Sequence, residues 1–176
     1  MRHSLFFYYS IRNGCDHMNK ASGTKLMLFI GSAELTGFIS SLITGFNSFS
    51  KFFSIYRKPP LLPPAWLFPV VWVILYAVMG TSAFLIYETE SDPALKKQAF
   101  LIYWGQLAFN FSWSIFFFRA MKIITAGAVI LTIIILCFLM ILSFRKINRT
   151  AGNMNIPYLL WLLFAAYLNT AVIILS

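Results

Sequence analysis

The stretch Ile123 to Phe144, IITAGAVILTIIILCFLMILSF, contains no charged residue and decides the class of the protein. A helix needs about 20 consecutive apolar residues to cross the hydrocarbon core of a bilayer, so this run is long enough to span it. Its only polar side chains are those of Thr125, Thr132 and Ser143. We therefore predict a membrane-spanning helix here, with most of its surface facing lipid.

Four more apolar runs of similar length lie on either side, separated by charged residues or prolines. The runs are continuous and do not alternate polar with apolar residues, which argues against a β-barrel. The predicted fold is an all-α integral membrane protein, a five-transmembrane-helix bundle that forms a single domain over residues 25–176. Its spans are predicted at residues 26–46, 65–87, 98–118, 123–144 and 157–175.

The composition supports a membrane protein. Of the 176 residues, 60% are hydrophobic, 18% are aromatic and only 11% are charged, whereas soluble domains have about 25% charged residues. Disordered chains are poor in aromatic residues, which excludes that class as well. The chain is thus predicted to be a multi-pass integral membrane protein, in the plasma membrane if its source is bacterial.

The net charge of +9 comes from 14 basic and five acidic residues. The basic residues stand between the apolar runs, as in loops and interfacial anchors, and do not form the single basic face that nucleic-acid binding needs. Nucleic acid is therefore not an expected partner. Counted over alternate loops, the basic residues place the N-terminus in the cytoplasm by the positive-inside rule.

Residues 1–24 precede the first span and differ from the rest of the chain. The apolar patch at residues 4–11 is too short to span a bilayer, and no small-residue cleavage site follows it. Two interpretations are open, a disordered cytoplasmic tail or a start assigned upstream of the true one.

The connection between the first two spans, residues 47–64, ends in Lys58-Pro-Pro-Leu-Leu-Pro-Pro64. Prolines fix φ and favour extended geometry in the residue before them, so this stretch should be stiff. It could lie over one mouth of the bundle as a lid, or it could be only a connector.

Ionisable groups are nearly absent from the predicted spans. Both histidines, His3 and His17, precede the spans, and the spans contain no Asp, Lys or internal Arg. Proton relays, ion-coupled carriers and metal sites normally need such groups at depth, so these functions are not expected. Glu34 is the one carboxyl within a span, and it either has a functional role or bonds a neighbouring helix.

Aromatic and amide side chains share one face on three of the predicted helices. Because a buried amide must be bonded, these faces should point towards protein or ligand. Such a lining suits a large, flat, mostly apolar ligand, although an interfacial tryptophan belt is the alternative and accounts for Trp66 and Trp104. The inward faces are Pro69, Trp72, Tyr76 and Gly80; Tyr103, Gln106, Asn110, Trp113 and Phe117; and Tyr158, Trp161, Ala165 and Asn169.

Small residues recur at four-residue steps along the first span, at Ala33, Gly37, Ser41 and Gly45. Small residues at this spacing let helix backbones approach closely in lipid. We predict a packing face within the chain, with a homodimer contact as the alternative.

Several motifs together resemble the translocator protein family, also known as the tryptophan-rich sensory protein (TspO/MBR) or peripheral benzodiazepine receptor family. The resemblance covers residues 26–175. It rests on Lys58-Pro-Pro, Pro63-Pro64-x-Trp66, Val71-Trp72-x-x-Leu75-Tyr76-x-x-Met79-Gly80, Asn110-x-x-Trp113 with Phe116-Phe117, and Pro157-Tyr158-Leu-x-Trp161-x-x-Phe164-Ala165-x-x-Leu168-Asn169.

The resemblance implies a five-helix bundle, usually dimeric, that binds porphyrins in a pocket closed by the first connection. It implies no obligatory cofactor and no metal, with protoporphyrin IX as the expected ligand and the bilayer and a second copy as partners. Trp72 and Trp161 match the tryptophans implicated in porphyrin binding and in its light-dependent breakdown. The further ligand-binding positions are expected to be Asn110, Tyr76, Trp113, Ala165, Phe53, Pro59 and Asn169.

The sequence also departs from the family pattern. The Trp-Tyr pair usual before the prolines is Phe52-Phe53, and the aromatic residue usual among them is Leu61. After Asn169 the chain has Thr170 and lacks the aromatic and basic residues of the animal cholesterol motif. With no histidine in the spans, a metal-free porphyrin stacked on indoles fits better than a histidine-ligated haem, and Lys51, Arg57 and Lys58 could pair with its carboxylates.

Three functions follow as alternatives. The first is a tetrapyrrole-binding sensor or translocator-like protein, and the second is a light-dependent porphyrin-degrading enzyme that uses Trp72 and Trp161. The third is a lipid or sterol binder or transporter, although the chain shows neither the internal repeats nor the broken helices typical of transporters. The sequence offers no acid–base or metal groups for catalysis in the dark.

Overall fold

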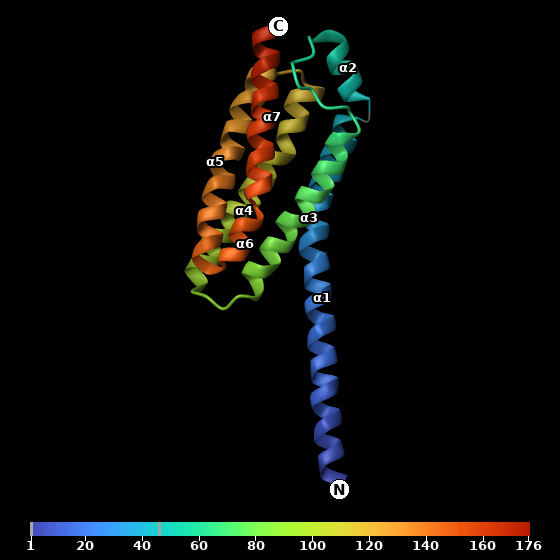
Figure 1. Ribbon diagram of the computed structural model, residues 1–176, viewed down its shortest axis with the longest axis vertical. Coiled ribbons are helices and arrows are strands. Elements are labelled where there is room, and N and C mark those ends of the chain that lie inside the picture. The colour runs from blue at the N-terminus through green and yellow to red at the C-terminus, as the bar shows by residue number, and fades with distance from the viewer. Residues whose placement is uncertain (1, 46) are drawn as a thin grey trace.

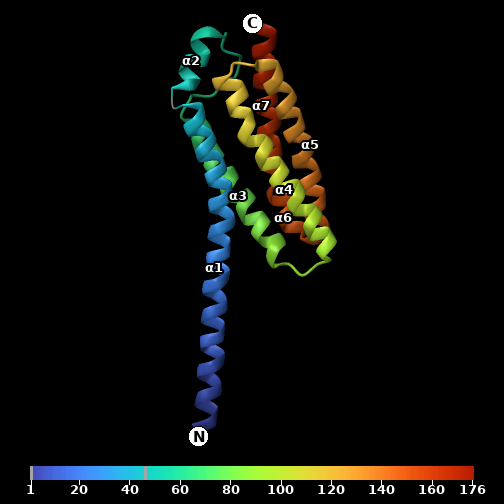
Figure 2. The same cartoon turned by 180° about the vertical axis from the view of Figure 1, so that it is seen from behind.

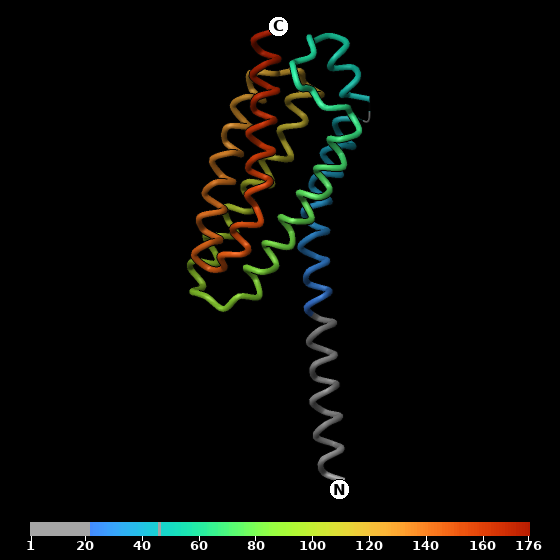
Figure 3. Tube along the Cα trace, in the orientation of Figure 1, coloured from blue at the N-terminus to red at the C-terminus, as the bar shows by residue number. Residues whose placement is uncertain are grey.

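The structure is a computed structural model that describes residues 2–45 and 47–176, with side chains from Ser22 onward (Figure 3). The alternatives for residues 1–24 rest mainly on a segment whose side chains lie outside the described residues, and they stay predictions. No strand interrupts the described ranges, so the prediction of an all-α membrane fold is confirmed. The elements are α1 (Arg2–Thr44), α2 (Ser48–Ile55), α3 (Leu67–Glu88), α4 (Pro93–Ser114), the π-helical turn η1 (Ile115–Arg119), α5 (Ile123–Ile147), α6 (Arg149–Met154) and α7 (Ile156–Leu175).

Four segments are long and apolar enough to cross a membrane, at residues 22–44, 67–88, 123–147 and 149–175. The fifth predicted span corresponds to α4, a 22-residue helix that runs beside α5 (Figure 1). Its lower hydropathy has a clear source, because α4 carries two lysines in its first turns and two buried amides, Gln106 and Asn110. Five long helices therefore make up the bundle.

A capping residue explains why α4 begins earlier than its apolar run suggests. The Asp92 carboxylate accepts a hydrogen bond from the Ala94 N–H at 2.8 Å, and Pro93 occupies the first turn of α4. A capped start with proline in the first turn favours a helix even in a charged segment. The predicted start at residue 98 was therefore five residues late.

The helices follow one another around the bundle in the order α3, α1, α4, α5, α7. The short helix α6 packs against both α3 and α5. Both views show α2 and the C-terminus at one end of the bundle and the turn between α3 and α4 at the other (Figures 1 and 2). The α3–α4 turn and α6 lie at the same end, opposite α2 and the C-terminus, whereas the side that faces the cytoplasm stays a prediction.

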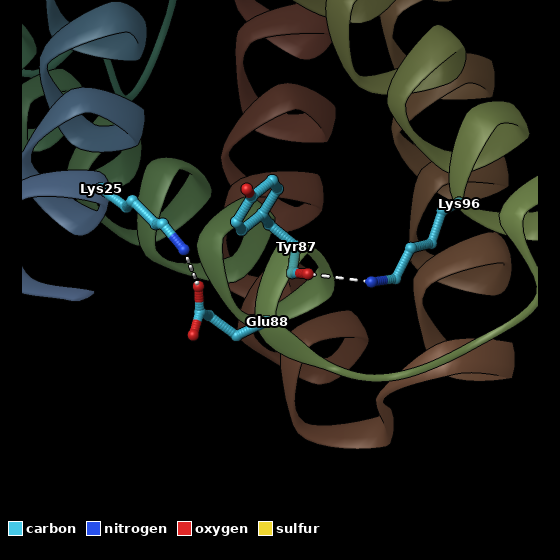
Figure 4. A network of polar contacts seen from close by, with 4 residues as sticks. All are labelled: Lys25, Tyr87, Glu88 and Lys96. Atoms are coloured by element: carbon cyan, nitrogen blue, oxygen red, sulfur yellow. Dashed lines mark hydrogen bonds and ion pairs between the residues drawn. The ribbon is translucent and has the colours of Figure 1, made fainter. Parts of the chain in front are cut away.

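At the end of the bundle away from α2, polar contacts tie three helices together (Figure 4). Lys25 Nζ of α1 lies 3.2 Å from Glu88 Oε1 of α3 and also sits 4.9 Å from the centre of the Tyr87 ring. Lys96 of α4 donates a hydrogen bond to the Tyr87 carbonyl oxygen at 2.9 Å. These contacts fix the spacing of α1, α3 and α4 at this end.

Small residues let α1 and α3 approach closely. A Cβ added at Gly80 would lie 2.5 Å from the Ile30 Cα, and Ala33 is fully buried. At Gly37 an added Cβ would meet the Tyr76 ring at 2.2 Å. The predicted packing face within the chain is thus correct for Ala33 and Gly37.

The same prediction is wrong for Ser41 and Gly45. Ser41 is exposed, and Gly45 lies beyond the end of α1 with φ of +94°. Ser40, the residue before Ser41, is buried instead. The Ser40 hydroxyl donates a hydrogen bond to the Phe111 carbonyl oxygen of α4 at 2.8 Å. A strict four-residue step drifts around a helix of 3.6 residues per turn, so the last members of the series leave the interface.

The lipid-facing prediction for the fourth span is correct only in part. One stripe of α5 is buried against α4 and α7, and the remaining apolar side chains are largely exposed. A helix that is apolar all round gives no sequence signal for the side that packs. The buried residues are Ala126, Ile130, Ile133, Cys137, Met140, Ile141 and Phe144.

Candidate functional site

Aromatic rings hold α3 and α7 together over the half of the bundle nearer α2. The Trp72 ring stacks on Tyr76 with centroids 5.4 Å apart and meets the Tyr158 ring edge-on at 6.2 Å. Phe68 of α3 meets Trp161 of α7 edge-on at 5.9 Å. We call these five rings the aromatic seam. Because large rings separate the two helices here, the spacing of α3 and α7 depends on side-chain conformation.

A chain of hydrogen bonds lies next to the seam and joins α3, α4 and α7. The Tyr76 hydroxyl donates to Asn110 Oδ1 at 2.7 Å, and Asn110 Nδ2 donates to the Tyr158 hydroxyl oxygen at 2.7 Å. Gln106 Nε2 donates to the same oxygen. All four side chains are buried, where an unbonded amide or hydroxyl would be costly. We refer to these four residues as the polar chain.

Two buried polar atoms close to this region have no hydrogen-bond partner among the described residues. They are Gln106 Oε1, an acceptor, and Trp113 Nε1, a donor. Buried polar groups in proteins are rarely left unpaired. One acceptor and one donor beside the polar chain are thus unused within the described part of the chain.

Residues 47–64 form a cover over this end of the bundle. The short helix α2 buries Phe52 completely, with its ring stacked on Phe117 at 4.5 Å. Beyond α2 the chain becomes extended at Tyr56, and Leu61 adopts a positive φ of 60°. The Tyr167 hydroxyl of α7 donates to the Pro60 carbonyl oxygen at 3.1 Å. These contacts favour the lid interpretation over a simple connector.

Under the cover lies a small apolar cavity of about 20 Å³. Sites for drug-sized ligands have volumes of about 300–1,000 Å³, so the structure shows this region closed. Rings from the cover fill most of the space, and a flat ligand could enter only if they move. The lining residues are Phe49, Phe53, Leu62, Phe68, Trp113, Phe117, Phe118, Ala165 and Leu168.

The structure brings most of the predicted site residues to this region. Trp72, Tyr76 and Asn110 lie in the seam or the polar chain, and Trp161 contacts both Phe68 and Phe164. Of the other predicted residues, Trp113, Ala165 and Phe53 line the small cavity, and Pro59 is buried in the cover.

Asn169 is placed differently. Its Nδ2 donates to the Ile123 carbonyl oxygen at 3.2 Å, and its Oδ1 lies 3.0 Å from where a Cβ of Gly127 would be. Both partners belong to α5, so Asn169 joins α7 to α5 and is not in contact with the polar chain. Exposed Trp66 and Trp104 lie outside the seam, in agreement with an interfacial role.

Four residues of this region were not among the predicted site residues: Tyr158, Gln106, Phe68 and Tyr167. Tyr158 and Gln106 were placed on inward faces, and their spacing carried the signal, three residues before Trp161 and four before Asn110. Phe68 precedes Trp72 by four residues, which is the same helical step. Tyr167 gave no signal, because its role depends on where the cover lies. Glu34 is partly buried on α1 and makes no hydrogen bond to any described residue.

Comparison with known proteins agrees with this architecture. The family model described as TspO/MBR family matches residues 29–175. The tryptophan-rich protein TspO of Chlorobaculum tepidum is 34% identical over 90% of this chain and 99% of its own length. The tryptophan-rich protein TspO of Archaeoglobus fulgidus is 30% identical over 86% of this chain and 97% of its own length. The translocator protein of Ovis aries is 32% identical over 68% of this chain and 71% of its own length.

The match extends from α1 to the last residue of α7 and so includes every helix that contributes to the aromatic seam and the polar chain. Members of this family are five-helix membrane proteins, in line with the five long helices found here. The chain therefore belongs to the TspO/MBR family of integral membrane proteins.

Proposed function

We propose that the protein is a tetrapyrrole-binding membrane sensor or translocator-like protein whose intramembrane pocket is closed by residues 47–64. The observation that carries the proposal is the aromatic seam beside the polar chain, beneath a cover that is itself rich in rings. Flat aromatic surfaces with a few fixed polar groups suit a large, flat, mostly apolar ligand.

The binding mode follows from these residues. Trp72 and Trp161 would offer indole faces to a porphyrin ring, while the free Nε1 donor of Trp113, which lines the small cavity, would orient it. The porphyrin carboxylates would need cations, and Arg57 and Lys58 are exposed on the cover, close to the same end. Charge-assisted bonds of this kind are about twice as strong as neutral ones.

Binding would require the cover to move. The closed cavity of about 20 Å³ cannot hold a tetrapyrrole, so Phe49, Phe53 and Phe68 must swing away first. Phe49 meets both Phe53 and Phe68 in tilted ring contacts, with centroids 4.9 and 5.3 Å apart. We therefore expect slow association, limited by opening of the cover.

The test is a titration of the purified protein with protoporphyrin IX in the dark, followed by tryptophan fluorescence. Trp72→Phe and Trp161→Phe should each weaken binding by about two- to tenfold, because aromatic pairs contribute about 0.5–1.5 kcal/mol beyond burial. Trp66→Phe is the matched control, since Trp66 is 65% exposed and makes no seam contact. Binding that is unchanged in both seam variants would refute the proposal, and no binding by the wild type would leave a lipid or sterol as ligand.

One observation favours a second candidate, the light-dependent porphyrin-degrading enzyme. Trp72 stacks on Tyr76, so two oxidisable rings lie in contact beside the proposed pocket. The same titration repeated under light separates the candidates. A new absorbing product that forms only in light, and not in Trp72→Phe or Trp161→Phe, would support the enzyme; fluorescence quenching without a product would support the binder.

A further inference from the structure

A second and larger cavity lies outside the aromatic seam, where α1 meets α2. It has a volume of about 330 Å³, which is within the range of small-molecule sites. Its walls come from the end of α1, the start of α2 and the turn after η1, including Thr44, Asn47, Ser48, Lys51, Arg119 and Met121. None of the polar chain takes part, and Phe118 is the one lining residue that this cavity shares with the small apolar cavity under the cover.

Two cations face this cavity and no acidic residue lines it. Lys51 is exposed, and its side-chain ammonium makes no hydrogen bond or ion pair among the described residues. The Arg119 guanidinium donates to the Ile43 carbonyl oxygen, which uses one of its five N–H groups. The remaining donors are available to an anion.

The nearest acidic side chains are far away. Glu88, Glu90 and Asp92 lie at the opposite end of the bundle. Glu34 is ten residues before Thr44, which is about 15 Å along a helix. Asp16 lies among the side chains that the structure does not describe. The positive potential of the cavity is thus not cancelled within the described part of the chain.

The position of the cavity matches the headgroup layer of a membrane. The apolar segment of α1 ends at Thr44, and the apolar segment of α5 begins at Ile123, directly after the turn that lines the cavity. Next to the mouth, Ile39, Leu42 and Ile43 are exposed on the outer surface of α1. A cavity lined by two cations, beside exposed apolar side chains of the preceding turns of α1, matches the two ends of a lipid molecule.

We propose that this cavity binds the phosphate of an anionic membrane lipid. Lys51 and Arg119 contact the phosphate oxygens, and an acyl chain lies along Ile39, Leu42 and Ile43. This inference does not depend on porphyrin binding.

The experiment measures lipid retained by the full chain. The protein is reconstituted in phosphatidylcholine nanodiscs that contain a minor fraction of phosphatidylglycerol, and native mass spectrometry counts the lipids that stay bound on release. The double variant Lys51→Gln/Arg119→Gln should retain about tenfold less phosphatidylglycerol, because two charge-assisted contacts are lost. The wild type should retain phosphatidylglycerol in preference to phosphatidylcholine.

A matched control removes the same charge elsewhere. Arg57→Gln/Lys58→Gln also loses one arginine and one lysine, but neither residue lines the cavity, so its retention should equal that of the wild type. A second variant covers the case in which Arg119→Gln destabilises the turn. Lys51→Glu removes no side-chain hydrogen bond of the fold, so it should retain less lipid without a change in thermal unfolding.

Three outcomes would overturn the proposal. Equal loss in the control pair would show general attraction by surface charge. Equal retention of phosphatidylcholine would show that the cavity does not select an anionic lipid. Displacement of the lipid by an excess of inorganic phosphate would show a site for a free anion.

Discussion

The two halves of α3 are built on different principles. In the half nearer α4's start, small residues bring backbones together: Gly80 lies against α1, and the Ser82 hydroxyl accepts a hydrogen bond from Asn155 Nδ2 at 2.9 Å. In the half nearer α2, α3 meets α7 through side-chain rings: Phe68 contacts Trp161, and Trp72 contacts Tyr158. Backbone packing fixes one spacing, whereas rings can rotate and repack. The first half therefore acts as a fixed base, and the second half is suited to open around a ligand.

The largest expected effect comes from disturbing the fixed half. Gly80→Val should lower the melting temperature by about 10 °C, because overpacking costs about 3 kcal/mol where backbone blocks the new side chain. Differential scanning fluorimetry in detergent checks this. Gly31→Val is the matched control, since a Cβ at Gly31 would meet nothing within 4 Å. A small effect at Gly80 would show that the base is not rigid.

The next effect concerns the polar chain. Asn110→Leu leaves the Tyr76 hydroxyl and one contact of Tyr158 unpaired, and should cost about 1–2 kcal/mol of the free energy of unfolding. Adding Tyr76→Phe should recover part of this loss, because two apolar partners are tolerated better than one unpaired hydroxyl. Equilibrium unfolding of the wild type, both single variants and the double variant gives the interaction free energy between Asn110 and Tyr76. Strict additivity would contradict the hydrogen bond between them.

A smaller effect should appear at the cover. Tyr167→Phe removes the bond to the Pro60 carbonyl, which contributes about 1 kcal/mol and so corresponds to about fivefold faster amide exchange in residues 47–64. Hydrogen–deuterium exchange with mass spectrometry measures this segment directly. Tyr87→Phe, at the other end of the bundle, should leave that segment unchanged. Equal exchange in wild type and Tyr167→Phe would mean that the ring contacts alone hold the cover.

The smallest effect should come from the ion pair at the fixed end. Lys25→Gln removes its bridge to Glu88, and exposed ion pairs of this kind contribute little to stability. The melting temperature should fall by about 1–2 °C at low salt. The difference should vanish at high ionic strength, because salt screens exposed charges. A difference that persists in high salt would point to packing of the lysine stem on the Tyr87 ring.

The long helices could be predicted because each is a continuous apolar run, and membrane crossing depends mainly on length and hydropathy. The inward faces also followed from spacing, as for Gln106, Asn110 and Trp113. Helical spacing states which side of a helix a residue occupies, but not which neighbour it meets. Asn110 and Asn169 illustrate this, since one joins the polar chain and the other bonds α5.

Other features depend on contacts that spacing does not encode. The segment 48–55 is too short to be helical by propensity alone, and its helix is supported by burial of Phe52. The closed state of the small cavity depends on ring rotamers in α2, η1 and α3. The hydrogen bond from Tyr167 to Pro60 joins residues 107 positions apart. Such pairings form only once the bundle exists.

The order of helices around the bundle also bears on how the protein is made. Chains fold from the N-terminus as they are synthesised, so α1 and α3 can pair while α4 and α5 are still emerging. The aromatic seam joins α3 to α7, which follows the other four long helices in the chain. The aromatic seam is therefore the last part of the bundle to be completed during biogenesis. Until α7 inserts, Phe68 and Trp72 lack their partners Trp161 and Tyr158, so a nascent chain truncated before α7 has no aromatic seam.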